Sequence, residues 1–153
     1  MKIVDMLKKE FIAVSLQSKD KADVLSELSS LFTYGNIKFN QSAMVKALLE
    51  REKLGTTGIG DGIAIPHGKL ADLDEMYVAF GKSDAGIPFE AMDGKPVHLF
   101  FLLVAPEQST GQHLKTLAKL SRMLKDVDFR KHLLEARTAD ELYRTIAEKD
   151  DVC

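Results

Sequence analysis

The segment VHLFFLLV, residues 97–104, is almost continuously apolar. A strand of this composition is usually covered on both faces, so we expect it to lie at the centre of a sheet. Pro106 follows shortly afterwards and is expected to end the strand. A second strand is predicted at residues 76–81, and the turn-rich residues 83–96 would carry the chain from one strand to the other.

The rest of the chain consists mainly of amphipathic segments with capping residues. Apolar side chains recur at helical spacing, and Ser, Thr, Asp or Asn stands where an N-cap is expected. Ser109 and Gln112 form one capping box, and Thr138 and Glu141 form another. The other expected elements are a helical turn at 3–7, a strand at 11–16, helices from Ser18 or Asp20 to about 34 and from Asn40 or Ser42 to 53, a strand at 63–65, and helices at 109–124, 129–136 and 138–148. This pattern predicts an α/β fold, a single layered domain over residues 1–153 with a mostly mixed central sheet flanked by helices.

The overall composition is that of a globular protein. The 153 residues are 45% hydrophobic and 29% charged, with a formal net charge of -2. No apolar run is long enough to span a membrane, and basic residues are dispersed among acidic ones, so we expect neither membrane insertion nor nucleic-acid binding. The start of the chain lacks the apolar core of a secretory signal, and the single cysteine, Cys153, cannot form an internal disulfide. These features indicate a cytoplasmic protein.

The most distinctive stretch is REKLGTTGIGDGIAIPHGKL, residues 51–70. Glycines fall at positions 55, 58, 60 and 62, which predicts a backbone able to approach a small ligand closely. Pro66 stiffens the arm that carries His67, because proline restricts its own backbone and that of the preceding residue. A stiffly held imidazole beside a loop with free backbone N–H groups is typical of a histidine that handles phosphate.

The residues beside His67 allow two interpretations each. Arg51 is either an exposed charge at a helix end or a planar donor group for phosphoryl oxygens. Two equally spaced apolar stripes are possible on its helix, one ending at Arg51 and the other at Glu52. Thr56 and Thr57 are either donors to phosphate, through hydroxyls or backbone N–H groups, or ordinary turn residues.

The other histidines differ in their surroundings. On spacing alone, His113 is a residue at the edge of the apolar side of a helix. At a helix N-terminus its ring would tend to stay neutral and could donate one N–H to a phosphate oxygen. His98 alternates into the central strand and is predicted to be structural, whereas His132 is predicted to be solvated.

Several familiar motifs do not fit the sequence. Residues 55–60 have the glycine spacing of a nucleotide P-loop, but Asp61 stands where the lysine is required. Ile63 stands where a dinucleotide-binding loop has its third glycine. No carboxylate or cysteine has a recognisable zinc-ligand spacing beside His67 or His113, so no metal site is expected.

The stretch from 51 to 70 resembles the active-site segment of the enzyme IIA proteins of the bacterial phosphoenolpyruvate-dependent phosphotransferase system. The resemblance is to the fructose and mannitol class, which includes a nitrogen-regulatory branch. The matching residues are Arg51-Glu52-Lys53, GTTGIG at 55–60, IAIPHG at 63–68 and Gln112-His113-Leu114. The resemblance implies that His113 is a second active-site histidine. It also implies a phosphoryl donor, a histidine-containing phosphocarrier protein that enzyme I charges from phosphoenolpyruvate.

We therefore interpret the chain as a phosphotransferase, a phosphoryl carrier with His67 as the covalent acceptor. Arg51, His113 and the loop at Thr56 and Thr57 would hold the phosphoryl oxygens, and these residues require no metal or organic cofactor. The stretch GTTGIGDGIAIPHGKL is similar to the nitrogen-regulatory branch, in which phosphorylation controls binding to regulatory target proteins. The alternatives are a sugar-transport IIA protein that passes the group to a IIB domain of a permease, and a non-catalytic module that binds a small anion.

Overall fold

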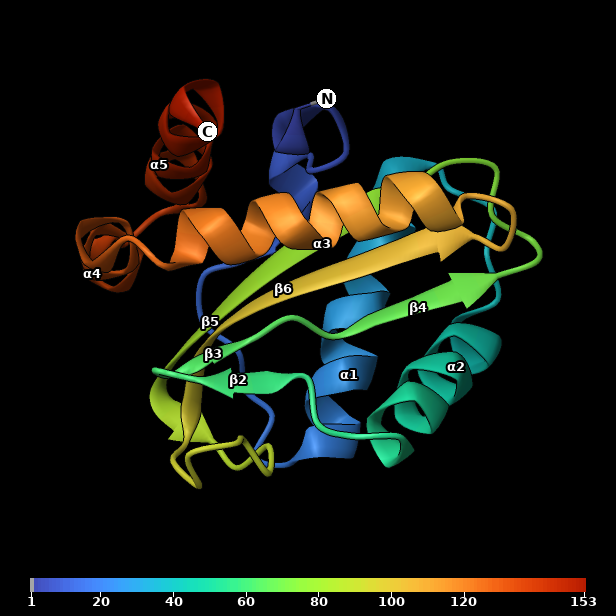
Figure 1. Ribbon diagram of the computed structural model, residues 1–153, viewed down its shortest axis with the longest axis horizontal. Helices are drawn as coiled ribbons and strands as arrows, with labels where there is room; N and C mark the ends of the chain where they lie inside the picture. The colour runs from blue at the N-terminus through green and yellow to red at the C-terminus, as the bar shows by residue number, and fades with distance from the viewer. Residues whose placement is uncertain (1) are drawn as a thin grey trace.

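The computed structural model describes residues 2–153, so Met1, the first residue of the expected domain, lies outside the described residues. The chain forms a mixed β-sheet with helices packed against it (Figure 1). The strands are β1 (Ile12–Ala13), β2 (Gly58–Gly60), β3 (Ile63–Ala64), β4 (His67–Leu70), β5 (Tyr77–Ile87) and β6 (Val97–Pro106). The helices are α1 (Lys21–Ser30), α2 (Gln41–Lys53), α3 (Thr110–Leu124), α4 (Val127–Glu135) and α5 (Ala139–Val152), with 3₁₀ turns at Ile3–Asp5, Lys9–Phe11 and Leu31–Gly35. This arrangement confirms the expected α/β class.

Strand β6 lies at the centre of the sheet, as its apolar sequence predicts. One edge of β6 pairs antiparallel with β5, and the other edge pairs parallel with β3 and then with β4. The strand order is β1-β5-β6-β3-β2, with β4 continuing along β6. Ile63 lies opposite Leu99 and His67 lies opposite Leu103, so one register is kept across the break at residues 65–66. Main-chain pairing with the best-buried strand therefore fixes the start of β4.

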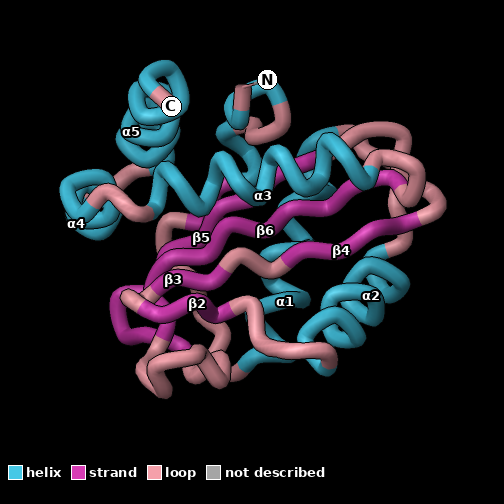
Figure 2. Tube along the Cα trace, viewed as in Figure 1, coloured by secondary structure: helices cyan, strands magenta, loops and turns pink. Residues whose placement is uncertain are grey.

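Helices cover both faces of the sheet (Figures 1 and 2). In this view α3 crosses in front of β5 and β6, whereas α1 lies behind the sheet. Helix α2 packs closely on β4 at Gly68. A Cβ added to this glycine would lie only 3.4 Å from Cδ2 of Leu48 on α2. Within residues 2–153 no helix combines the length and the apolar character that crossing a bilayer requires.

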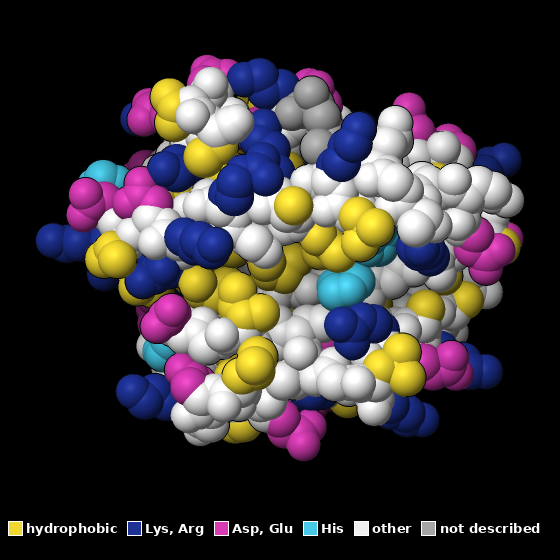
Figure 3. All heavy atoms as spheres, in the orientation of Figure 1, with side chains coloured by type: hydrophobic (Ala, Val, Ile, Leu, Met, Phe, Trp, Pro, Cys, Tyr) yellow, Lys and Arg dark blue, Asp and Glu magenta, His cyan; other side chains and the backbone are white. Residues whose placement is uncertain are grey.

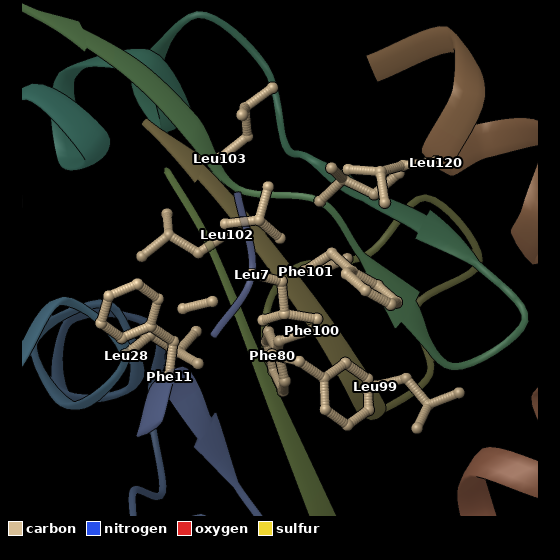
Figure 4. Close-up of a cluster of buried hydrophobic side chains, with 14 of the residues drawn as sticks. Leu7, Phe11, Leu28, Phe80, Leu99, Phe100, Phe101, Leu102, Leu103 and Leu120 are labelled. Carbon is tan, nitrogen blue, oxygen red and sulfur yellow. The ribbon is translucent and has the colours of Figure 1, made fainter. Parts of the chain in front are cut away.

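The core surrounds β6 (Figure 4). Each residue from 99 to 105 is at most 1% exposed. The rings of Phe80 and Phe101 contact each other at a centroid distance of 4.8 Å, which ties β5 to β6. Burial of apolar side chains is the dominant favourable contribution to folding. Because buried side chains are close-packed, β6 and its neighbours form a rigid frame.

Capping side chains fix the first residue of most of the α-helices. Asp20 rather than Ser18 caps α1, Asn40 rather than Ser42 caps α2, and Thr138 caps α5. In each case a side-chain oxygen accepts the backbone N–H three residues later, at 2.8, 2.9 and 3.1 Å respectively. These caps satisfy donors that a helix cannot satisfy itself, which explains why they are readable in the sequence.

Two helix starts differ from the expectations. The hydroxyl of Ser109 donates to the carbonyl oxygen of Pro106 at 2.7 Å and makes no capping bond, so the expected capping box of α3 does not form. Helix α4 begins at Val127 rather than at residue 129, because Asp126 accepts N–H groups of the first turn.

The strand boundaries differ more strongly. Strand β5 continues to Ile87 instead of ending near residue 81, because long β6 offers it an antiparallel partner. The first strand is only two residues long, whereas residues 11–16 were expected to form it. Strands β2 and β4 were not expected, because their sequences contain glycine and follow turn signals; pairing with β3 and β6 makes them strands.

Candidate functional site

His67 is the first residue of β4, and both of its ring nitrogens have partners. Nδ1 lies 2.9 Å from the carbonyl oxygen of Ile65, and Nε2 lies 3.2 Å from Nε of Arg51. A carbonyl oxygen only accepts and a guanidinium N–H only donates, so Nδ1 carries the proton in this neutral ring. Nε2 therefore holds the lone pair, which makes it the nucleophilic atom of the imidazole.

Arg51 reaches His67 from the last turn of α2. The buried stripe of this helix ends at Glu52, and Arg51 lies beside it, half-buried. Its Nη1 donates to the carbonyl oxygen of Gly55 at 2.8 Å, which fixes the plane of the guanidinium. Because a guanidinium has five N–H donors in a rigid fork, Arg51 can also hold acceptor oxygens that arrive beside His67.

His113 stands in the first turn of α3 and packs against His67. The two ring centroids are 5.3 Å apart, with an angle of 73° between the ring planes. His113 is only 3% exposed, and within residues 2–153 its Nδ1 has no hydrogen-bond partner. A buried nitrogen without a partner is costly, so His113 is a strained feature of this site and not an ordinary core residue.

The electrostatics of the site favour two neutral imidazoles. Burial, followed by the charges of His67 and Lys69, lowers the pKa of His113 to about 4. Burial also lowers the pKa of His67, with a further contribution from Arg51, although the hydrogen bond to Ile65 opposes these effects. Both rings are therefore uncharged near pH 7, while the cations of Arg51 and Lys69 attract anions to the same place.

A hollow of about 580 Å³ lies over these side chains, between α2, β4 and α3. Figure 3 shows histidine side chains at the surface, bordered by hydrophobic groups and by lysine or arginine. The exposed side chains of Leu54 and Leu114 contribute to this border, with exposed fractions of 84% and 61%. The site is thus open to a partner and has an apolar rim.

The glycine-rich loop does not surround His67, contrary to the expectation of a phosphate cradle. Gly58 lies opposite Ala64 in an antiparallel hairpin of β2 and β3, before the chain reaches His67. Backbone N–H groups of this loop already have partners within the protein. Those of Gly55 and Thr57 donate to Glu52. That of Gly58 donates to Thr56, and that of Asp61 donates to Asp93. The glycines instead permit a tight turn, in which Gly60 and Gly62 have positive φ.

Neither Thr56 nor Thr57 lines the hollow at His67. The hydroxyl of Thr56 donates to the carbonyl oxygen of Phe89 at 3.2 Å and accepts the backbone N–H of Gly58 at the start of β2. Thr57 is buried, and its hydroxyl donates to the carboxylate of Glu52. The structure therefore brings Arg51 and His113 to His67, but it does not bring the two threonine side chains there.

Lys69 is a residue of this site that sequence reasoning missed. It lines the hollow, and its Nζ donates to the hydroxyl of Thr110 at 2.9 Å, next to the start of α3. A signal was present, because residues two apart on a strand share a face, and Lys69 follows His67 at that spacing. That signal required residues 67–70 to be recognised as a strand.

The other two histidines lie outside this hollow. The ring of His98 donates from Nδ1 to the carbonyl oxygen of Ser83 at 2.8 Å, within the sheet. His132 is exposed on α4. Across the part of the chain that the structure describes, no three His, Cys, Asp or Glu side chains are placed to bind a metal ion.

A mixed sheet flanked by helices that presents a neutral histidine beside an arginine and a second histidine is an arrangement that suits phosphoryl transfer. Comparison with protein-family models agrees with this chemistry. The chain belongs to the family described as phosphoenolpyruvate-dependent sugar phosphotransferase system, EIIA 2, whose model matches residues 5–149.

Similar proteins include both nitrogen regulatory proteins and sugar-specific components of this system. A nitrogen regulatory protein from Bradyrhizobium diazoefficiens is 43% identical over 147 residues, which cover 96% of this chain and 95% of that protein. A fructose-specific EIIABC component from Bacillus subtilis is 38% identical over 150 residues, which cover 98% of this chain but only 24% of that protein. The crystal structure of nitrogen regulatory protein IIA-Ntr from Neisseria meningitidis matches with a TM-score of 0.87 at 32% identity, over 94% of this chain and 98% of that one.

Proposed function

We propose that this protein is a phosphohistidine carrier, one domain over residues 1–153, which accepts a phosphoryl group on Nε2 of His67. The observation that carries the proposal is the pair of contacts on the ring of His67. The carbonyl oxygen of Ile65 accepts the Nδ1 proton, and Nε2 lies beside the guanidinium of Arg51 at 3.2 Å. Nε2 thus holds the lone pair that attacks phosphorus, once the Arg51 N–H turns from Nε2 to the oxygens of a phosphoryl group that approaches through the open hollow.

The donor in this proposal is the phosphohistidine of a histidine-containing phosphocarrier protein. The lone pair of Nε2 forms a bond to phosphorus while the nitrogen–phosphorus bond of the donor breaks, and that electron pair returns to the donor ring. No proton needs to leave His67, because Nδ1 keeps its proton and the carbonyl of Ile65 stabilises the positive charge that develops on the ring. Such a transfer depends on in-line positioning and charge stabilisation, and the same step in reverse passes the group on.

Arg51 and His113 are the proposed stabilisers of the transferred phosphoryl group, and we add Lys69 to them. Arg51 can turn unused N–H donors toward the equatorial oxygens. A neutral His113, which lines the hollow, can donate one ring N–H to a phosphoryl oxygen. Thr56 and Thr57 are proposed to act only indirectly, by shaping the loop that follows α2.

Docking of the phosphocarrier is proposed to use the apolar rim of the hollow. Leu54 and Leu114 line the hollow and have large exposed fractions. A partner that covers these side chains would exclude water from the phosphoryl group during transfer, which strengthens the electrostatic contacts made by Arg51. A donor charged from phosphoenolpyruvate by enzyme I implies that the protein works in the cytoplasm.

Between the two branches we favour the nitrogen-regulatory one, in which the phosphorylation state would control binding to regulatory target proteins. The support is that a nitrogen regulatory protein matches this chain over 95% of its own length, whereas the fructose-specific relative is about four times longer than the matched part. The alternative is that His67 passes the group to a IIB domain of a separate sugar permease. Capture of partners by each phosphorylation form separates the two, because a IIB domain would indicate sugar transport.

The decisive experiment measures the intact mass of the protein after incubation with phosphoenolpyruvate, enzyme I and the phosphocarrier. We expect one acid-labile phosphoryl group on the wild type, none on His67→Ala, and one on His132→Ala, which alters an exposed histidine on α4. A wild type that gains no phosphoryl group would favour the non-catalytic anion-binding module. Equal labelling of His67→Ala would place the acceptor elsewhere.

A further inference from the structure

Glu52 is a buried carboxylate at the end of α2, directly after Arg51 in the chain. Its side chain is only 4% exposed. Oε1 accepts the backbone N–H of Thr57 at 3.1 Å, and Oε2 accepts the hydroxyl of the same residue. A buried carboxylate bound in this way is a rigid anchor, because moving it would leave a charge and several donors unpaired.

From Thr57 a chain of backbone hydrogen bonds runs to the ring of His67. The carbonyl oxygen of Thr57 accepts the N–H of Ile65 at 3.1 Å. The carbonyl oxygen of Ile65 in turn accepts the Nδ1 proton of His67 at 2.9 Å. The residue whose carbonyl oxygen selects the tautomer of His67 is thus bonded through its N–H to Thr57, the residue that Glu52 holds.

The other partner of His67 also depends on Glu52. Nη1 of Arg51 donates to the carbonyl oxygen of Gly55 at 2.8 Å, and the N–H of Gly55 donates to the carbonyl oxygen of Glu52 at 3.1 Å. The turn that orients the guanidinium is therefore closed onto Glu52. This branch uses the main-chain carbonyl of Glu52, whereas its carboxylate acts on the Nδ1 side of His67 through Thr57.

Lys21 supplies the counter-charge for the buried carboxylate. Its Nζ lies 3.0 Å from Oε1 of Glu52 and 3.3 Å from Oε1 of Glu90. The side chain of Lys21 is 17% exposed, whereas that of Glu90 is 84% exposed. The pair ties α1 to the end of α2, and Glu90 is its solvent-exposed end.

We propose that Glu52 is a positioning residue for phosphoryl transfer at His67. Through Thr57 and Ile65 its carboxylate keeps the proton of the imidazole on Nδ1, and by fixing Thr57 it anchors the end of the turn that follows Arg51. Glu52 does not line the hollow at His67, so it acts through these residues and not on the phosphoryl group. The transfer step rests on the function proposed above, whereas the tautomer of His67 is a property of the free protein.

The test compares Glu52→Gln with Glu90→Gln, which removes only the exposed partner of Lys21. Imidazole ¹⁵N chemical shifts report the tautomer of His67 in the free protein, and kcat and KM are measured for phosphoryl acceptance from the phosphocarrier. In Glu52→Gln we expect a smaller Nδ1–H population and a kcat lower by about 10- to 100-fold, with KM within about twofold of wild type, because misplaced supporting groups lower the rate of the positioned step. Glu90→Gln should match the wild type in all three quantities.

A second pair of variants decides the matter if Glu52→Gln does not fold. Thr57→Val removes the hydroxyl that binds Glu52 and should shift the tautomer population and lower kcat, whereas Thr57→Ser keeps the hydroxyl and should rescue most of the effect. Wild-type tautomer populations and wild-type kcat in a folded Glu52→Gln, or in Thr57→Val, would overturn the positioning role. If the wild type accepts no phosphoryl group, the proposed function fails, and the ¹⁵N shifts still decide whether Glu52 positions the ring.

Discussion

The two halves of the segment from 51 to 70 look alike in sequence as candidates for phosphate binding, but they differ in structure. The glycine-rich half, residues 55–62, folds into a hairpin whose polar groups bond within the loop and to the side chains of Glu52 and Asp93. The second half, residues 65–69, lies along β6 and carries His67 and Lys69 into the hollow. The comparison teaches that the reactive side chain is held by a strand with a rigid neighbour and not by the flexible-looking loop.

The largest effect is expected at the strand-borne site, from Arg51→Ala. Loss of a donor aimed at the transferred group should slow phosphoryl acceptance by about 100- to 1000-fold. Lys53→Ala is the matched control, since it removes a charge from the same helix end outside the hollow at His67 and should leave the rate within about twofold. Rapid-quench measurement of phosphohistidine formation checks both. A normal rate in Arg51→Ala would exclude the guanidinium from the site.

The next effect concerns stability in acid and arises from His113. Its pKa is about 4 in the folded protein and about 6.5 when unfolded. Between these values the unfolded state binds more protons, so the free energy of unfolding falls as pH falls from about 6.5 to 4, by about 2 to 3 kcal/mol. His113→Gln should remove this part of the pH dependence in urea titrations, whereas His132→Gln should retain it. Equal slopes for wild type and His113→Gln would contradict the buried neutral ring.

The hairpin is expected to respond to Gly58→Ala through stability and not through catalysis. A Cβ at this position would lie 2.9 Å from Cα of Ala91, so we expect a loss of about 1 to 3 kcal/mol in the free energy of unfolding. Gly111→Ala is the control, because nothing lies within 4 Å of its added Cβ and alanine favours the helix. The folded fraction of Gly58→Ala should accept the phosphoryl group from the phosphocarrier at the wild-type rate. A strongly reduced rate in that folded fraction would return the loop to the site.

The smallest effect is expected from Thr56→Ala. Its hydroxyl links Phe89 and Gly58, so its removal should lower the free energy of unfolding by about 1 kcal/mol. The phosphoryl-acceptance rate should change by less than about threefold, because the hydroxyl does not line the hollow. Paired thermal melts and single-turnover assays measure the two quantities. A hundredfold slower transfer with unchanged melting would show that Thr56 contacts the phosphoryl group directly.

The sequence by itself determined the features that depend on nearby residues. The apolar run at 97–104 predicted the central strand, and capping residues marked helix starts at Ser18 or Asp20, at Asn40 or Ser42 and at Thr138, of which the structure uses Asp20, Asn40 and Thr138. These predictions succeed because burial patterns and caps are written within a few positions of the residues that they govern.

Only the tertiary structure decided which residues meet at His67. Parallel pairing with β6 turned residues 67–70 into a strand and brought Lys69 into the hollow, while the packing of α3 placed His113 against the ring. The amide partners of the glycine loop and the buried bonds of Glu52 likewise come from segments that pairing brings together. Such contacts join residues far apart in the chain, and their energy depends on register and burial, which local composition does not specify.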